Sequence, residues 1–346
     1  MKQGSKVHKV LEEQVHQVVP VEVQTREDGW GLKIWNVIQG LRTLRITGMT
    51  RELEVWGVID GQVVNGIIDE LSFRSPASEE GDGGPDGQKT SISQSELQPA
   101  QKTISEFFNA GLDSIGFPLS SQQKSKKVYL TDVKTRSSKY LPQGTSLLPT
   151  WYQLMLYHRL LSSLASNIVS AQTIFDRYRL DAAAPFSDAF IAEIGGLNFN
   201  FHTDSDSADY SFGNDKDAVT ELLEHNNLNA LWSLMILEFS RTIPTESSIG
   251  DALTAEFRSQ KDGTVLGSKT FKFDEKILNG YVGSEMAWWK GEREAKGVDI
   301  EDAFKCRICE FADECTWRKA KANEGVERYK ARTGRTSEVI HSVTPR

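Results

Sequence analysis

The chain has 346 residues, of which 38% are hydrophobic and 25% are charged, and its formal net charge is −8. This length is enough for one large domain with an ample core. The acidic balance argues against a protein that coats nucleic acid through its overall charge, but it allows a DNA enzyme with a local basic groove. The sequence has no run of about 18 apolar residues, so no membrane span is predicted. Its first residues are polar and charged, so no signal peptide is predicted.

A helix and a hairpin are predicted for the first part of the chain. Apolar residues recur at helical spacing over 5–18, which predicts one buried stripe. Two strand-like runs follow, over 53–59 and 63–73, and the Asp60-Gly61 pair between them favours a tight turn. Asp60 therefore fits a turn better than a catalytic site. The next stretch is rich in Ser, Gly, Gln and acidic residues, so we expect a mostly disordered insertion over 75–125.

Regular structure is predicted to return after this insertion. The run "KVYLTDVKTR", 127–136, reads as a strand, and 148–165 reads as a helix with one apolar face. Residues 218–240 are also mostly helical. A second hairpin is expected over 253–273, and a helix is expected over 275–296.

This order of elements predicts a mixed α/β (α+β) fold, with a central mixed sheet flanked by helices. We expect a single domain built from residues 1–74 and 126–325, with the cysteine motif at 306–315 near its end. Residues 326–346 are expected to form a flexible tail.

Two of the predicted strands each carry an aspartate, Asp69 in "VNGIIDELSF" and Asp132 in "VYLTDVKTR". If these strands pair, both carboxylates lie at one end of the sheet, where their hard oxygen atoms suit Mg²⁺ or Mn²⁺. Lys134 points to the same face of its strand as Asp132. This group suits phosphodiester hydrolysis, because a metal activates water and a lysine stabilises phosphate charge. From the spacing alone, two strand-end acids that cap turns are the simpler interpretation.

Helical spacing adds four more candidates. His8 and Glu12 share a face of the first helix, so a neutral His8 imidazole could bind the metal with Glu12 as its hydrogen-bond partner. Gln153 and Tyr157 share a face of the helix after the lysine strand, where they could hydrogen-bond the lysine or a DNA phosphate. Ordinary packing or solvent exposure is the alternative for both pairs.

All three cysteines of the chain, Cys306, Cys309 and Cys315, fall in "CRICEFADEC". Such clustering does not predict a disulfide framework, so we expect a reducing compartment. The spacing is typical of a metal or iron–sulfur site, which usually has four protein ligands. A zinc knuckle is the alternative; it also needs a fourth ligand, for which His341 is available.

The sequence resembles the exonuclease V family, within the RecB-like branch of PD-(D/E)xK nucleases. Five stretches carry the resemblance, in the family's order: "GSKVHKVLEEQVH", "GIIDELSF", "YLTDVKTR", "QLMLYHRLL" and "GVDIEDAFKCRICEFADECTWR". The resemblance implies a restriction-endonuclease-like core and a C-terminal segment with a [4Fe–4S] cluster. It implies a metal-dependent exonuclease for single-stranded DNA in DNA repair and genome maintenance, in the nucleus or the mitochondrion.

The resemblance also implies roles for individual residues. The family's metal ligands are matched by His8, Asp69 and Asp132, and its other catalytic residues by Lys134, Gln153 and Tyr157. The three cysteines match three cluster ligands. The family's first cluster cysteine precedes the histidine-bearing helix, and this sequence has no cysteine there. We therefore expect the chain to be truncated on its N-terminal side; loss of the cluster, or a fourth ligand of another type, is the alternative.

Two further groups suggest partners. Arg136, Lys139 and Tyr140 closely follow the motif lysine and are candidates for phosphate contacts and base stacking. In the expected insertion, "QKTISEFF" has the Q-x-x-I-x-x-F-F pattern of peptides that dock on the sliding clamp PCNA. Its key residues are Gln101, Ile104, Phe107 and Phe108. The alternative is a short helix that folds back on the nuclease body.

Two other functions are open. A catalytically idle protein that binds DNA or the clamp would keep the fold, although the presence of Asp69, Asp132 and Lys134 together argues against it. A metal-dependent oxygenase could use His8 and the aspartates, but it would leave the lysine strand and the cysteine run without a role. We expect a monomer without membrane association.

Overall fold

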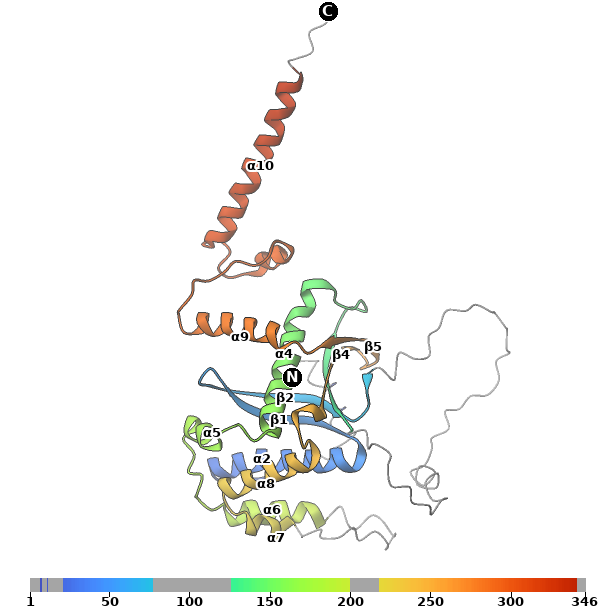
Figure 1. Ribbon diagram of the computed structural model, residues 1–346, viewed down its shortest axis with the longest axis vertical. Helices are drawn as coiled ribbons and strands as arrows, with labels where there is room; N and C mark the ends of the chain where they lie inside the picture. The colour runs from blue at the N-terminus through green and yellow to red at the C-terminus, as the bar shows by residue number, and fades with distance from the viewer. Residues whose placement is uncertain (1–6, 8–10, 12–20, 77–125, 200–217, 341–346) are drawn as a thin grey trace, which may run out of the picture.

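The computed structural model describes residues 7, 11, 21–76, 126–199 and 218–340. Within these residues, helices pack around one five-stranded sheet (Figure 1). The predicted mixed α/β fold with a central mixed sheet is confirmed. Nearly all of the predicted first helix, over 5–18, lies outside the described residues, as does nearly all of the predicted insertion.

The strands lie in the sheet in the order in which they occur in the chain. β1 (Met49–Ile59) and β2 (Gln62–Ser72) form an antiparallel hairpin, and β3 (Val128–Arg136) is antiparallel to β2. β3 is parallel to β4 (Ile249–Ser259), and β5 (Val265–Lys272) is antiparallel to β4. A parallel pair needs a long crossover, and the connection from β3 to β4 supplies it with the helices α4 to α8.

The first hairpin turns at Asp60 and Gly61, as predicted. Both residues have positive φ, 50° and 77°, which is typical of a type I′ turn. The Asp60 carboxylate pairs with Lys290, Nζ to Oδ2 2.5 Å, at the end of helix α9 (Glu275–Trp289). Asp60 is therefore a turn residue that also connects the hairpin to α9.

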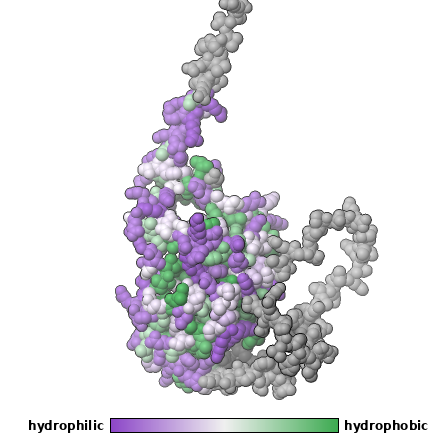
Figure 2. Space-filling model, in the orientation of Figure 1, coloured by the Kyte–Doolittle hydropathy of each residue, from purple (hydrophilic) through white to green (hydrophobic). Residues whose placement is uncertain are grey.

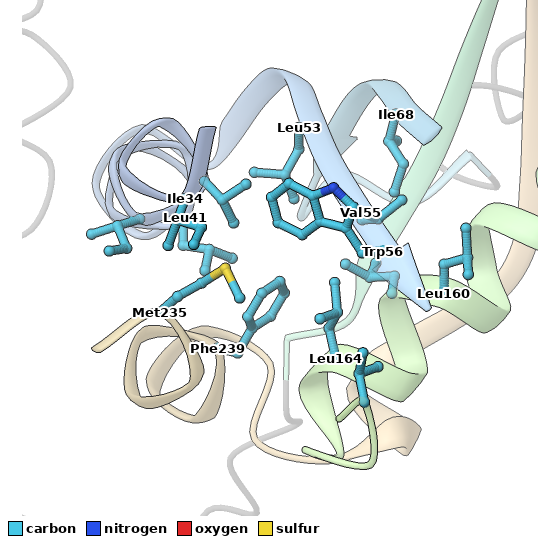
Figure 3. Close-up of a cluster of buried hydrophobic side chains, with 14 of the residues drawn as sticks. Ile34, Leu41, Leu53, Val55, Trp56, Ile68, Leu160, Leu164, Met235 and Phe239 are labelled. Carbon is cyan, nitrogen blue, oxygen red and sulfur yellow. The ribbon is translucent and has the colours of Figure 1, made fainter. Parts of the chain in front are cut away.

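The main core lies around β1. Helices α2 (Arg26–Thr47) and α4 (Leu148–Ala165) both pack on β1, and α8 (Leu228–Thr242) packs along α2. In Figure 3, Trp56 lies among side chains from these helices. The buried residues labelled around it are Ile34, Leu41, Leu53, Val55, Ile68, Leu160, Leu164, Met235 and Phe239. Removal of this apolar surface from water is the main stabilising contribution to the fold.

No helix is predicted from the sequence over 26–47, where the structure has α2. The helix starts with a capping box: Thr25 Oγ1 accepts from the Asp28 amide at 2.9 Å, and the Thr25 amide donates to Asp28 Oδ2 at 3.0 Å. It ends at Gly48, which has φ 85°. The capping residues Thr25, Asp28 and Gly48 are the features from which this helix could have been predicted. The sequence of α2 shows no single apolar stripe, because the helix buries residues against both β1 and α8.

Asp28 also connects α2 to the start of α6 (Asp188–Phe199). Its fully buried carboxylate accepts hydrogen bonds from the Ser187 amide at 3.0 Å and from the Ser187 hydroxyl at 2.9 Å. Burial alone would raise the pKa of Asp28, but the hydrogen bonds from Ser187 and Thr25 outweigh it and lower that pKa.

The other predicted helices differ in their ends. The helix predicted over 218–240 is two helices, α7 (Ala218–Glu224) and α8, because Asn227 caps a new start through its side chain. α9 ends at Trp289 and not at 296, since Gly291 turns into the left-handed region with φ 73°. The remaining elements are α5 (Ala171–Tyr178), η2 (Gly144–Leu147), η3 (Glu246–Ser248), η4 (Ile300–Ile308) and α10 (Thr316–Ile340).

The helix α10 extends away from the rest of the protein (Figure 1), and the part of it that is coloured in Figure 2 is largely hydrophilic. All side chains over 318–333 are exposed. The structure thus has a helix, up to Ile340, over most of the range predicted as a flexible tail. Among the helices that the structure describes, none is long and apolar enough to cross a membrane.

A buried histidine makes stability depend on pH. His158 of α4 is only 5% exposed, and its ring stacks on Phe273 with ring centroids 4.1 Å apart. Burial disfavours the charged imidazolium and lowers the pKa of His158 from 6.5 to about 4. Between these pH values the unfolded chain binds a proton that the folded protein does not.

We therefore expect the free energy of unfolding to fall as the pH drops below about 6.5, by about 1.4 kcal/mol per pH unit and about 3 kcal/mol in total near pH 4. Urea unfolding across this range measures the loss. The variant His158→Phe keeps an aromatic ring against Phe273 and should show a smaller loss in this window. Equal pH dependence of the two proteins would contradict the assignment.

Candidate active site

The site forms where β2 and β3 stop pairing. The antiparallel register between them runs from Ser72↔Tyr129 to Glu70↔Thr131 and ends there. The next pair in this register would be Asp69 and Asp132. Instead, the Asp69 carboxylate accepts a hydrogen bond from the Val133 amide, Oδ2 to N 2.6 Å. The predicted strand pairing thus brings the two aspartates together, at the point where β2 continues beside β1 only.

Lys134 lies at the Asp132 carboxylate. Its Nζ is 3.0 Å from Oδ1 and 2.8 Å from Oδ2 of Asp132, and it also donates to Gln153 Oε1 at 2.9 Å. Asp132 is 1% exposed, and a buried carboxylate is costly without a compensating partner. The side chain of Lys134 is 33% exposed, so its ammonium connects this buried acid to the surface.

Helix α4 completes a chain of hydrogen bonds. Gln153 Nε2 donates to the Tyr157 hydroxyl at 2.8 Å, so Gln153 joins Tyr157 to Lys134 through its two amide ends. Burial raises the pKa of Tyr157, and the charges of Asp132 and Asp69 raise it further. Tyr157 is therefore a neutral phenol near pH 7. The spacing of four residues predicted that both side chains share a face, and in the structure Gln153 contacts the lysine while Tyr157 contacts Gln153.

Glu70, next to Asp69 in β2, points to the opposite face of the strand and belongs to a separate group. It pairs with Arg51 at 2.7 Å across the hairpin. Burial raises the pKa of Glu70, and the negative charge of the nearby Glu256 raises it further. The positive charge of Arg51 lowers this pKa but does not outweigh burial. Glu256 in turn pairs with Arg258 at 2.5 Å. Glu70 is therefore an ion-pair residue of the hairpin.

The candidate DNA-binding residues lie at the end of β3 and just after it. The Arg136 guanidinium lies over the Phe257 ring, 6.0 Å from its centroid. Lys139 is exposed, and Tyr140 is 85% exposed. The other predicted site residues, His8 and the clamp-binding residues over 101–108, lie outside the described residues, and their roles stay predictions.

The cysteine run lies near the same end of the fold. The Thr145 hydroxyl of η2 donates to Asp302 of η4 at 3.1 Å, which connects the segment to the loop after β3. Cys306 and Cys315 are half-buried and Cys309 is exposed. Within the described ranges, no group of three or more His, Cys, Asp or Glu side chains is placed to hold a metal. The described residues alone therefore do not form a [4Fe–4S] site, and the cluster stays a prediction.

The sequence matches a known family over most of its length. A family described as "Exonuclease V - a 5' deoxyribonuclease" matches residues 1–318. The chain belongs to the exonuclease V family. Exonuclease V of Danio rerio is 26% identical over 316 residues, which cover 91% of this chain and 61% of that protein. The resemblance inferred from the motifs is thus confirmed.

Two yeast members of the exonuclease V family match a shorter stretch. The proteins named "Exonuclease V, mitochondrial" of Candida dubliniensis and Candida albicans are each 32% identical, over 83 and 81 residues. These stretches cover 24% and 23% of this chain and 13% of each relative. The chain spans less than two thirds of the length of these relatives. The family match ends at 318, so most of α10 lies beyond it.

The donor atoms at the Asp69–Asp132 site fit a hard divalent cation. Asp69 and Asp132 offer carboxylate oxygens, which suit Mg²⁺ or Mn²⁺ better than soft metals. Mg²⁺ often takes only one or two protein carboxylates and fills its other positions with water and substrate phosphate. Two carboxylates are thus enough for a site of this kind.

The role of the Val133 amide, which orients Asp69, could not be predicted from the sequence, because every residue except proline carries a backbone N–H group.

Proposed function

We propose that this protein is a metal-dependent exonuclease that hydrolyses single-stranded DNA in DNA repair and genome maintenance. One observation carries the proposal: two aspartates meet where β2 and β3 part, and Lys134 is held at the buried Asp132 by Gln153. Membership of the exonuclease V family supports nuclease chemistry. The alternative, a catalytically idle DNA- or clamp-binding protein, would have no need for this hydrogen-bonded group.

Each residue has a distinct task in this proposal. A divalent ion held by Asp69 and Asp132 would lower the pKa of a bound water and offset phosphate charge. The Lys134 ammonium has three donors, and Asp132 and Gln153 occupy two of them. The third can donate to a phosphate oxygen or orient the attacking water. Tyr157 fixes the Gln153 amide, and thereby the direction of the lysine.

Single-stranded DNA fits the residues beyond the lysine, of which Lys139 and Tyr140 are exposed. Tyr140 offers a ring for base stacking, while Arg136 and Lys139 offer positive charge for phosphates. Free bases are available for stacking only in unpaired strands, so Tyr140 favours a single-stranded substrate. The mitochondrial names of the yeast relatives support a mitochondrial location, and a nuclear location is a second proposal.

The test is digestion of end-labelled linear single-stranded DNA by the purified protein with Mg²⁺. We expect digestion to stop when EDTA removes the metal and to resume when excess Mg²⁺ or Mn²⁺ is added. A circular single strand of the same sequence is the matched control and should stay intact, because an exonuclease needs an end. Digestion that persists in EDTA, or a folded protein that leaves linear DNA intact, would contradict the proposal.

A further inference from the structure

Two glycines of the β1–β2 hairpin lie directly against helix α4. A Cβ atom built on Gly66 would lie 2.4 Å from Cε1 of Tyr157, and one built on Gly57 would lie 2.6 Å from Cδ2 of Leu160. Both distances are below the 3.0 Å that real Cβ atoms respect. Neither glycine has a positive φ. Their missing side chains thus supply room for α4, not backbone freedom.

The two close approaches differ in what they support. Leu160 is a core residue with 2% exposure, and it contacts other apolar side chains. Tyr157 ends the hydrogen-bond chain that runs through Gln153 to Lys134. We infer that Gly66 is a positioning residue for Lys134. Because Gly66 has no side chain, the Tyr157 ring lies close enough to β2 for its hydroxyl to accept the hydrogen bond from Gln153. This inference rests on the proposed nuclease function.

The distances indicate how sensitive this arrangement is. To return from 2.4 Å to ordinary contact at 3.4 Å, the Tyr157 ring or β2 must shift by about 1 Å. The hydrogen bond from Gln153 to the Tyr157 hydroxyl is 2.8 Å long, and about 1 Å more exceeds the length of any hydrogen bond. The Tyr157 ring is rigid, whereas the methyl group of Leu160 can turn aside. A methyl group at position 66 should therefore release Gln153, and one at position 57 should not.

The experiment compares Gly66→Ala with Gly57→Ala, two variants with the same added methyl group against the same helix. In the single-strand digestion assay, Gly66→Ala should lower kcat by about 10- to 100-fold, because a shift of about 1 Å misaligns the lysine. Its KM should change by less than about twofold, since the proposed DNA contacts of Lys139 and Tyr140 lie away from Tyr157 and should not move. Gly57→Ala should keep kcat within about threefold of the wild-type value, although its Tm should fall about as far as that of Gly66→Ala. Equal kcat losses in the two variants would overturn the inference.

A double-variant cycle tests the route through Tyr157. In Tyr157→Phe the phenol is already absent, so adding Gly66→Ala should lower kcat by less than about threefold. A full additive loss would mean that Gly66 acts by another route and would overturn the inference. If Gly66→Ala alone does not fold, Gly66→Ala with Tyr157→Leu should fold, because the obstructing ring is gone. Failure of that pair to fold as well would also overturn it.

A readout without activity separates this inference from the proposed function. With 3-fluorotyrosine placed at position 157, Gly66→Ala should shift the ¹⁹F resonance and Gly57→Ala should leave it in place. If wild-type protein digests no DNA but this shift is present, the proposed function fails while the contact of Gly66 with Tyr157 stands. If the resonance is unmoved by Gly66→Ala, the inference fails whatever the enzyme does.

Discussion

Replacing Lys134 with methionine is expected to lower the rate of single-strand digestion by about 100- to 1,000-fold, the usual effect of removing one preorganised donor at a reacting phosphate or carbonyl. Methionine keeps an unbranched side chain but has no ammonium group to meet Asp132 and Gln153. Lys127→Met, at an exposed lysine just before β3, is the matched control and should keep digestion within about twofold. The rates are measured on end-labelled single strands at saturating Mg²⁺.

The same change should also affect stability, and this separates two explanations of lost activity. Without Lys134, the buried Asp132 carboxylate loses the ammonium that lies 2.8 Å from its Oδ2, so metal-free Lys134→Met should lose about 1–3 kcal/mol of unfolding free energy. Asp132→Asn with Lys134→Met removes both charges and should regain most of that loss. It should stay inactive. Digestion by Lys134→Met above about one-tenth of the wild-type rate would contradict the assigned role of the lysine.

The part of this site that the sequence predicts depends on local periodicity. Asp132 and Lys134 are two residues apart in a strand and Gln153 and Tyr157 four apart in a helix, so each pair had to share a face once its element was identified. The β-branched runs around Asp69 and Asp132 identified the two strands. Local spacing could not show that the two faces meet, and the hydrogen bond from Lys134 to Gln153 supplies that fact.

The rest of the site depends on contacts between distant parts of the chain. The break in pairing at Asp69 depends on the Val133 amide, 64 residues away in sequence. The room that Gly66 leaves for Tyr157 has meaning only when α4 crosses the hairpin. Neither feature has a periodic pattern. The helix α2 was missed for a related reason: its caps are clear, but its buried residues face two neighbours at once.

A buried carboxylate on α8 is another feature that local sequence did not predict. Glu238 is 1% exposed and receives hydrogen bonds from Arg45 at 2.5 Å and Arg42 at 3.1 Å, both on α2. Arg42 also makes a bidentate pair of hydrogen bonds to the Glu221 carboxylate of α7, at 2.7 and 2.8 Å. This network joins α2, α7 and α8. Burial alone would raise the pKa of Glu238, but Arg45 and Arg42 outweigh it and lower that pKa.

Glu238→Ala is therefore expected to lower the free energy of unfolding by about 3 kcal/mol, because it leaves Arg42 and Arg45 without their shared acceptor. Glu238→Gln keeps the shape and some of the hydrogen bonds and should lose about 1–2 kcal/mol. The control is Arg241→Ala. Arg241 also reaches Glu238, at 3.1 Å, but its side chain is 56% exposed, so its loss should cost less than about 1 kcal/mol. Urea unfolding near pH 7 measures all three.

The pH dependence gives an independent check on Glu238. Because its pKa is lower in the folded protein, its contribution is present above the ordinary value of 4.5 and is lost as the pH falls through the folded-state pKa. Glu238→Gln should therefore approach the wild-type stability at acid pH and fall below it near pH 7. A constant difference between the two proteins across this range would mean that the loss comes from packing and not from the carboxylate charge, so α2 and α8 would not depend on this ion-pair network.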